Sequence, residues 1–303
     1  ARFQTSAQMP HGICELFSIL SAAAWAVGVI LYRRLGESLP PLQLNFLKNC
    51  LVFMMLIPAI PLLHGFALPS FSGQQIFLSV LSGLIGIGLA DTLYFRALNE
   101  VGAGRMGILG NFYSPFVLLL SFIFLGDRLN PWQWCGFALV SSGVFLASKP
   151  SAVEASRPAH YFRGLMFGLL SIGLMAISII LVKRVLEAQP LLWVTGLRML
   201  GAVIGMVLIA AFRQELFLLK PPKAMRWKPL IIAAFVGQFV AMVFWLAGYK
   251  FTSASVAAIL NETASVFILL LAWLWLKEPL TRRGLIGVGL TLSGVSFMLW
   301  ARS

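Results

Sequence analysis

Long apolar runs separated by short polar stretches dominate the pattern along this chain. A helix that crosses a bilayer needs about 20 predominantly apolar residues, and ten runs approach that length. Transmembrane barrel strands would alternate polar and apolar residues, which these runs do not do. We therefore predict ten membrane-spanning helices, at Ile13–Tyr32, Leu42–Leu62, Gln74–Leu98, Met106–Leu125, Trp132–Ser148, Gly164–Val182, Leu191–Phe212, Pro229–Tyr249, Ser253–Leu276 and Gly284–Ala301.

The second half of the chain repeats the first at a spacing of 150 residues. The matched pairs are Ser21–Ser171, Arg34–Arg184, Pro40–Pro190, Lys48–Arg198, Ala97–Ala247 and Asn111–Asn261. Two halves with five spans each are inverted relative to one another, because an odd number of crossings brings the chain out on the opposite side. We predict an all-α polytopic membrane protein with a first repeat at residues 1–148, a linker at 149–162 and a second repeat at 163–303.

Composition indicates a lipid environment rather than an aqueous one. The chain is 59% apolar and 11% charged, whereas soluble domains contain about 25% charged residues. The chain has a net charge of +13, and most of its basic residues lie in the gaps between apolar runs, where they would meet lipid headgroups. This placement argues against a nucleic-acid partner. One set of connecting segments holds about fifteen Lys and Arg, and the opposite set, with both termini, holds six. Under the positive-inside rule this favours termini outside the cell, in a multi-pass protein of a bacterial inner membrane.

No constellation of residues in the sequence predicts an enzyme. The three histidines lie at helix ends or in loops, and no Gly-Lys-Ser/Thr motif could cradle phosphates. The cysteines, Cys14, Cys50 and Cys135, lack the spacing of metal ligands. We expect no catalytic residue, no metal and no cofactor, and we expect the energy for any transport to come from a proton or substrate gradient.

Four ionisable residues within the apolar runs are the first candidates for function. A charge at a helix centre costs about 2.5–3.5 kcal/mol on insertion scales, so it usually faces a cavity or a partner. Lys48 and Arg198 are repeat equivalents that suit either a pair of anion contacts or snorkelling to headgroups. Glu262 has no charged neighbour within ten residues and suits a proton carrier, a cation contact or a structural hydrogen bond. Asp91 lies five residues before Arg96, off the spacing of three or four that favours a helical ion pair.

Amide and aromatic side chains complete the predicted substrate site. Asn111 and Asn261 are repeat equivalents that could either join helices or contact substrate, because an amide both donates and accepts. The remaining candidates, which could line an amphipathic cavity or face lipid, are Gln238, Trp25, Tyr94 and Trp245.

Motifs in both halves resemble the EamA repeat of the drug/metabolite transporter superfamily. They are Ala247–Leu260, Lys277-Glu278-Pro279-Leu280 and Leu292–Val295 in the second half, and Tyr94–Leu98, Gly126-Asp127-Arg128-Leu129 and Trp132–Val144 in the first. The resemblance implies ten helices in two inverted five-helix repeats, a central cavity and alternating access. The related four-helix multidrug exporters carry a glutamate deep in the first helix, where this chain has Trp25.

The sequence therefore favours a secondary active transporter, most readily an exporter of a small amphoteric metabolite such as an amino acid. Bases would hold a carboxylate, and an acid would hold an ammonium group or carry a proton. The expected partners are the substrate, the bilayer and protons as the coupling ion. Two alternatives stay open: a carrier for a drug or for a phosphate-bearing or lipid-linked substrate, with Lys48 and Arg198 as phosphate grips, and a non-transporting membrane scaffold.

Overall fold

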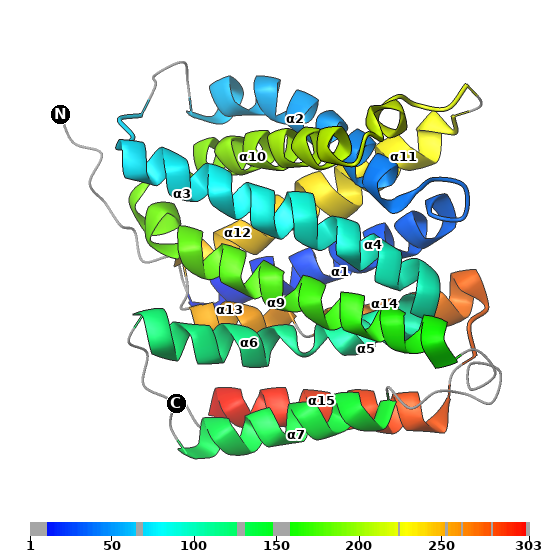
Figure 1. Cartoon of the computed structure of the whole chain (residues 1–303). Coiled ribbons are helices and arrows are strands. Elements are labelled where there is room, and N and C mark those ends of the chain that lie inside the picture. Colours follow the sequence, from blue (N-terminus) through cyan, green and yellow to red (C-terminus); the bar gives the residue numbers. More distant parts are fainter. Residues whose placement is uncertain are drawn as a thin grey trace.

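The computed structural model of the chain is a bundle of helices that run in roughly the same direction across the molecule (Figure 1). It describes residues 11–64, 69–125, 131–147, 158–223, 225–251, 254–261, 263–279 and 281–300. The first half contains α1 (His11–Leu35), α2 (Pro41–His64), α3 (Gly73–Gly83), the π-helical η1 (Leu84–Leu89), α4 (Ala90–Val101), α5 (Ala103–Gly110), α6 (Tyr113–Leu120), the π-helical η2 (Ser121–Leu125) and α7 (Pro131–Ala147). The second half contains α9 (Pro158–Ala188), α10 (Leu191–Phe212), the 3₁₀ turn η3 (Leu216–Leu219), α11 (Trp227–Ala234), the π-helical η4 (Phe235–Val240), α12 (Ala241–Phe251), α13 (Ala254–Asn261), α14 (Ala264–Leu276) and α15 (Arg282–Trp300).

Seven segments of the described chain are long and apolar enough to cross a bilayer. They are Leu16–Leu35, Pro41–Leu62, Gly73–Val101, Ala103–Leu125, His160–Ala188, Leu191–Phe212 and Trp227–Phe251. The other three predicted spans correspond to α7, to α13 with α14, and to α15, which fall outside that group. The chain is thus an all-helical polytopic membrane protein.

The distribution of polarity is the reverse of that in a soluble protein. Large apolar side chains face outward, such as Leu62 at 81% exposure and Phe212 at 88%. Several charged side chains are buried inside the bundle, and Lys48 and Arg198 are 0% and 1% exposed. Lipid accepts the apolar exterior, whereas a charge avoids it by turning toward the interior of the bundle.

Helices from the two halves pack against each other in repeat-related pairs. α1 packs on α12, and the equivalent pair α9 and α4 is also in contact. α7 packs on α15, and α2 packs on α10. Small residues allow this close approach: a Cβ atom at Gly83 would collide with the backbone of Arg198, and one at Gly201 would collide with the backbone of Val80. The two halves therefore form one interlocked bundle.

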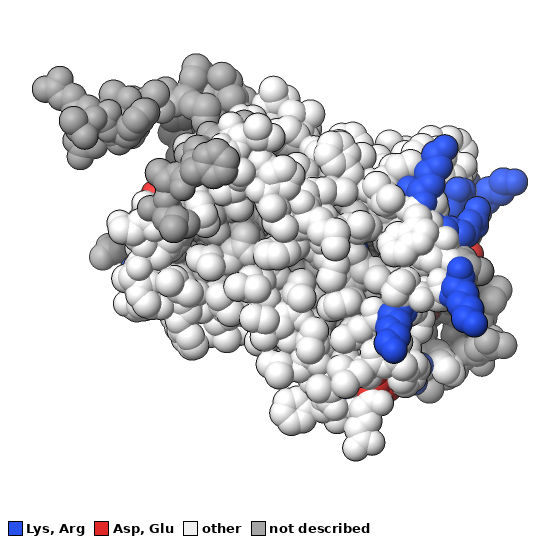
Figure 2. Space-filling view, turned by 90° about the horizontal axis from the view of Figure 1, so that it is seen from above, with Lys and Arg blue, Asp and Glu red and all other residues white. Residues whose placement is uncertain are grey.

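Basic side chains gather at one end of the molecule, where the segment between α10 and α11 lies (Figure 2). That segment and the first turn of α11 supply five exposed basic residues, which are Arg213, Lys220, Lys223, Arg226 and Lys228. Helices that begin at this end include α9 and α11, and α1 begins at the opposite end (Figure 1).

Candidate functional site

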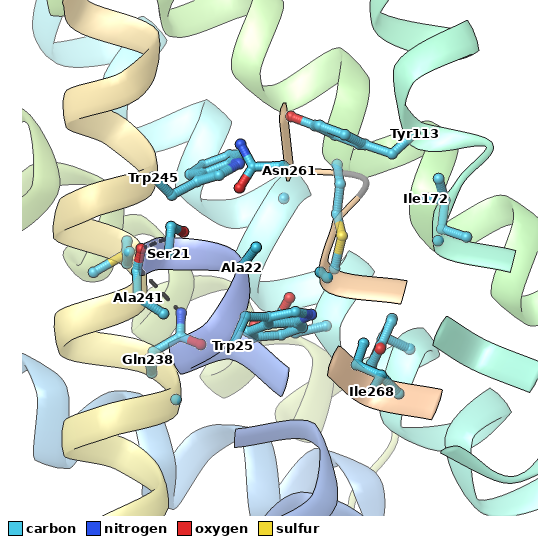
Figure 3. A pocket seen from close by; sticks show the side chains of 18 of the residues that line it. Ser21, Ala22, Trp25, Tyr113, Ile172, Gln238, Ala241, Trp245, Asn261 and Ile268 are labelled. Carbon is cyan, nitrogen blue, oxygen red and sulfur yellow. Dashed lines mark hydrogen bonds between the residues drawn. The ribbon is translucent and has the colours of Figure 1, made fainter. Parts of the chain in front are cut away.

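A cavity of about 170 Å³ lies inside the bundle and takes its lining from both repeats. Figure 3 shows Trp25 and Gln238 toward one end of it and Trp245 and Tyr113 toward the other. Most of its wall is apolar, with a few polar groups, as is usual for a small-molecule site. The lining residues are Ser21, Ala22, Trp25, Gly86, Ile87, Asp91, Tyr94, Met106, Gly107, Gly110, Asn111, Tyr113, Ile172, Met175, Ser178, Arg198, Gly237, Gln238, Ala241, Met242, Trp245, Asn261, Ala264, Ser265 and Ile268.

A π-helical segment occupies the equivalent place in each repeat and borders the cavity. η1 contributes Gly86 and Ile87 to the lining, and η4 contributes Gly237 and Gln238. η1 packs on α9 and η4 packs on α1, so each segment meets the first helix of the other repeat. π-bulges are rare and frequently lie at functional sites. The third and eighth predicted spans are therefore not uniform α-helices, and both depart from that geometry beside the cavity.

The fourth and ninth predicted spans are interrupted beside the cavity, at repeat-equivalent asparagines. A turn at Asn111 separates α5 from α6, and α13 ends at Asn261 before α14 begins. Asparagine favours such ends because its short side chain competes for backbone hydrogen bonds. Nδ2 of Asn261 donates to the carbonyl oxygen of Ala257 at 2.7 Å, whereas Nδ2 of Asn111 is buried with no partner among the described residues. Within the described residues, neither side-chain amide nitrogen donates a hydrogen bond to another membrane helix.

Lys48 of α2 is held by an acid from α4. Its Nζ atom lies 2.6 Å from Oδ2 of Asp91 and donates to Oε1 of Gln238 at 3.1 Å. It also lies 5.5 Å and 4.9 Å from the ring centroids of Tyr32 and Phe95. Asp91 and Gln238 line the cavity, and Lys48 lies behind them. The lysine therefore neither snorkels to headgroups nor contacts the cavity directly, and its charge is balanced by Asp91.

Arg198 of α10 is equally buried but is held by neutral groups. Nη1 donates to Oγ of Ser82 at 3.0 Å, and Nη2 donates to Oγ of Ser178 at 3.3 Å. The guanidinium carbon lies 5.9 Å from the ring centroid of Trp245. Nε has no partner, and no acid pairs with Arg198 within the described chain. Arg198 lines the cavity and has no ion-pair partner there among the described residues.

Aromatic side chains form a group at each end of the cavity. Trp25 and Tyr94 lie with ring centroids 5.6 Å apart. At the other end, the centroids of Tyr113 and Trp245 are 6.3 Å apart, and the hydroxyl of Tyr249 donates to that of Tyr113 at 2.9 Å. Such tilted pairs are favourable for aromatic rings, so packed aromatic side chains form both ends of the cavity.

The structure brings most of the predicted site residues to this one cavity. Eight of them line it, namely Asn261, Asn111, Arg198, Asp91, Gln238, Trp25, Tyr94 and Trp245. Lys48 reaches the cavity only through its contacts with Asp91 and Gln238. Glu262 lies outside the described residues.

Two residues that border Arg198 or its aromatic neighbour, Ser178 and Tyr113, were not among the predicted site residues. Ser178 of α9 accepts a hydrogen bond from the guanidinium of Arg198. It is uncharged, and its repeat equivalent is Gly28, so neither charge nor the repeat pattern identifies it in the sequence. Tyr113 lies two positions after Asn111, and this proximity to a candidate residue could have indicated that Tyr113 also lines the cavity.

Comparison with known proteins gives matches over both halves. Residues 12–149 and 162–300 each match the EamA-like transporter family. An uncharacterized transporter from the cobO 3′ region of a Sinorhizobium species is 30% identical over 132 residues, which is 43% of this chain and 93% of that protein. Protein PecM of Dickeya dadantii (strain 3937) is 26% identical over 68% of each chain. The pseudopaline exporter CntI of Pseudomonas aeruginosa is 24% identical over 87% of each chain.

A solved crystal structure has the same fold, with a TM-score of 0.74 at 17% sequence identity, over 97% of this chain and 99% of that one. The family covers nearly the whole chain as two successive units, in keeping with the two interlocked helical halves and the cavity between them. Its members are transporters and not enzymes. The chain belongs to the EamA-like transporter family, within the drug/metabolite transporter superfamily.

Proposed function

We propose that this chain is a secondary active transporter that exports a small amphoteric metabolite, such as an amino acid, by alternating access. The observation that carries the proposal is the cavity whose lining comes from both repeats. A site at the interface between repeats can open to either side when one repeat rocks against the other. Buried charged and amide side chains at the cavity supply contacts for a polar substrate.

In this proposal ten helical rods cross a bacterial inner membrane, five in each of two inverted repeats joined at residues 149–162. The rods are α1, α2, α3 to α4, α5 to η2, α7, α9, α10, α11 to α12, α13 to α14, and α15. Equivalent contacts of α1 with α12 and of α9 with α4 support a two-fold relation between the halves. The basic end faces the cytoplasm under the positive-inside rule, which puts the start of α1 on the outer side.

The substrate and direction are supported by the chemistry of the cavity and by a relative. CntI, which is 24% identical, is named as a pseudopaline exporter. Glu262 follows the cavity residue Asn261 in the sequence and is our candidate to hold an ammonium group or carry a coupling proton. Lys48 is engaged by Asp91, which favours an amphoteric substrate over a phosphate held between two free cations.

Counterflow in proteoliposomes tests this proposal. Vesicles preloaded with unlabelled amino acids should accumulate a radiolabelled one when they contain the protein, and protein-free vesicles should not. Gly110 lines the cavity, and a Cβ atom added there meets nothing within 4 Å. Gly110→Phe should therefore block accumulation, because the added ring would occupy part of the cavity. Gly289→Phe is the matched control, since that glycine also has open space but lies on α15 away from the lining. If no amino acid gives counterflow, the proposed substrate class is wrong. If the Gly110→Phe variant gives undiminished counterflow, the cavity is not the transport route.

A further inference from the structure

We infer that Arg198 binds a carboxylate of the transported molecule, and that the substrate class is small monocarboxylates with an apolar remainder. The inference rests on the proposed function and names the group that the cavity recognises. Its first support is a guanidinium that is 1% exposed and, in the described chain, has only two serine hydroxyls as hydrogen-bond acceptors. A buried charge is costly unless an anion accompanies it.

The second support is a difference between the repeats. In the first repeat Lys48 on α2 pairs with Asp91 on α4. In the second repeat the equivalent cation is Arg198 on α10, and α10 packs on α12 in the same way that α2 packs on α4. The position equivalent to Asp91 is Ala241, at the start of α12 and in the cavity lining. At these equivalent positions, the second repeat therefore has the cation, Arg198, but not the acid that pairs with the cation of the first repeat.

The empty acid position lies on the face of α12 that meets Arg198. Ala241 and Trp245 are four residues apart on one helix, so they share a face, and both border the cavity in Figure 3. Arg198 lies over the ring of Trp245. An anion in the cavity beside Ala241 would therefore lie where Asp91 lies for Lys48.

Two buried donors without hydrogen-bond partners belong to residues that line the cavity. Nε of Arg198 and Nδ2 of Asn111 are both buried without a hydrogen-bond partner in the described structure, and both residues line the cavity. A carboxylate has two oxygens and about four acceptor positions, so it has the capacity to accept from more than one such donor. Charge-assisted hydrogen bonds of this kind are about twice as strong as neutral ones.

The charge balance of the described lining residues favours a monoanion. Within the described lining, the fully charged residues are Arg198 and Asp91, and Asp91 is neutralised by Lys48. Among these described residues, the remaining charge is a single positive one. A carboxylate matches it, whereas a phosphate monoester, at about −1.5 to −2 near neutral pH, exceeds it. Apolar and aromatic walls such as Trp25 and Ile268 are left for the rest of the molecule (Figure 3).

Binding to the purified full-length protein tests the inference with chemically matched probes. The probes are each of the twenty common amino acids in three forms: the free acid, the α-amide and the deaminated acid. The readout is the dissociation constant from thermal-shift titration.

The decisive variants are Ala241→Asp, which installs the acid of the first repeat beside Arg198, and Ala241→Asn, which adds the same volume without charge. Arg198→Gln removes the cation, and Arg184→Gln removes an exposed cation of α9 as the control.

We expect at least one free or deaminated acid to bind while its amide does not. Ala241→Asp should weaken that binding about ten- to hundredfold relative to Ala241→Asn. Arg198→Gln should weaken it similarly, and Arg184→Gln should not. Equal binding of amides and acids, equal affinity of the Asp and Asn variants, or the absence of binding by every carboxylate would each overturn the inference. Counterflow of a compound that lacks a carboxylate would overturn it while leaving transport intact, whereas no counterflow of any compound would overturn transport itself.

Discussion

Gly28 of α1 and Gly237 of η4 are in direct backbone contact: a Cβ atom at Gly28 would lie 2.5 Å from the Cα atom of Gly237. The contact joins the first helix of one repeat to the π-helical segment of the other, beside the cavity. In lipid, where apolar burial does not drive helices together, such close packing is a main source of association. Any side chain at either position must push the repeats apart.

Gly237→Ala should therefore destabilise the protein by about 1–3 kcal/mol, the usual cost of overpacking. The melting temperature of the detergent-solubilised protein measures this. Gly289→Ala is the control, because a Cβ there meets nothing within 4 Å. Equal melting temperatures for the two variants would show that the contact does not limit packing.

The buried ion pair predicts a non-additive double mutant. Lys48→Met leaves Asp91 unpaired in the interior, and Asp91→Leu leaves Lys48 unpaired, so each change should cost about 3–5 kcal/mol. The double variant Lys48→Met with Asp91→Leu removes both charges and should be more stable than either single variant. Denaturation of all four proteins in one detergent measures the coupling, and costs that simply add would contradict the pairing.

Glu278 ties the loop before α15 to the start of α5. Its two carboxylate oxygens accept from the backbone N–H groups of Ala103 and Gly104, at 3.0 and 2.8 Å. Glu278→Ala removes both acceptors and should lower stability by about 0.5–2 kcal/mol, as loss of a helix cap does. Glu37→Ala, at an exposed position, should change it by less than about 0.5 kcal/mol. Hydrogen exchange at the start of α5 should quicken in the first variant only; unchanged exchange there would refute the cap.

Trp25 and Tyr94 limit one end of the cavity, with ring centroids 5.6 Å apart. Trp25→Ala should enlarge that end and shift the preference of counterflow toward substrates with bulkier apolar parts. Competition between a small and a large labelled substrate measures the shift, and Trp227→Ala, on an exposed side chain of α11, is the control. An unchanged preference would mean that Trp25 does not contact the transported molecule.

Much of the architecture followed from the sequence because hydropathy and repetition are direct consequences of the lipid solvent and of a repeated structural unit. Membrane helices and two successive repeats were predictable from apolar runs and from pairs such as Asn111 and Asn261. The π-helical segments were not, because helices that are apolar all round lack the periodic signal that would reveal one inserted residue.

The cavity residues were partly predictable for a related reason. A charge inside an apolar run is marked by its cost, so Arg198 and Asp91 stood out. The pairing of Lys48 with Asp91 could not be predicted, because the two residues are 43 positions apart and hydropathy does not show which helices are neighbours. Ser178 carries no such mark, since an isolated serine is common in membrane helices.

Alternating access requires that the cavity open to both sides of the membrane, and this can be measured directly. In a variant that lacks Cys14, Cys50 and Cys135, Ala22→Cys places a thiol in the lining, and Ile57→Cys places one at an outward position that is 60% exposed. Oriented vesicles are treated with a membrane-impermeant thiol reagent from one side or the other. We expect labelling of position 22 from either side and none at position 57. Labelling of position 22 from one side only, under every substrate gradient, would contradict alternating access.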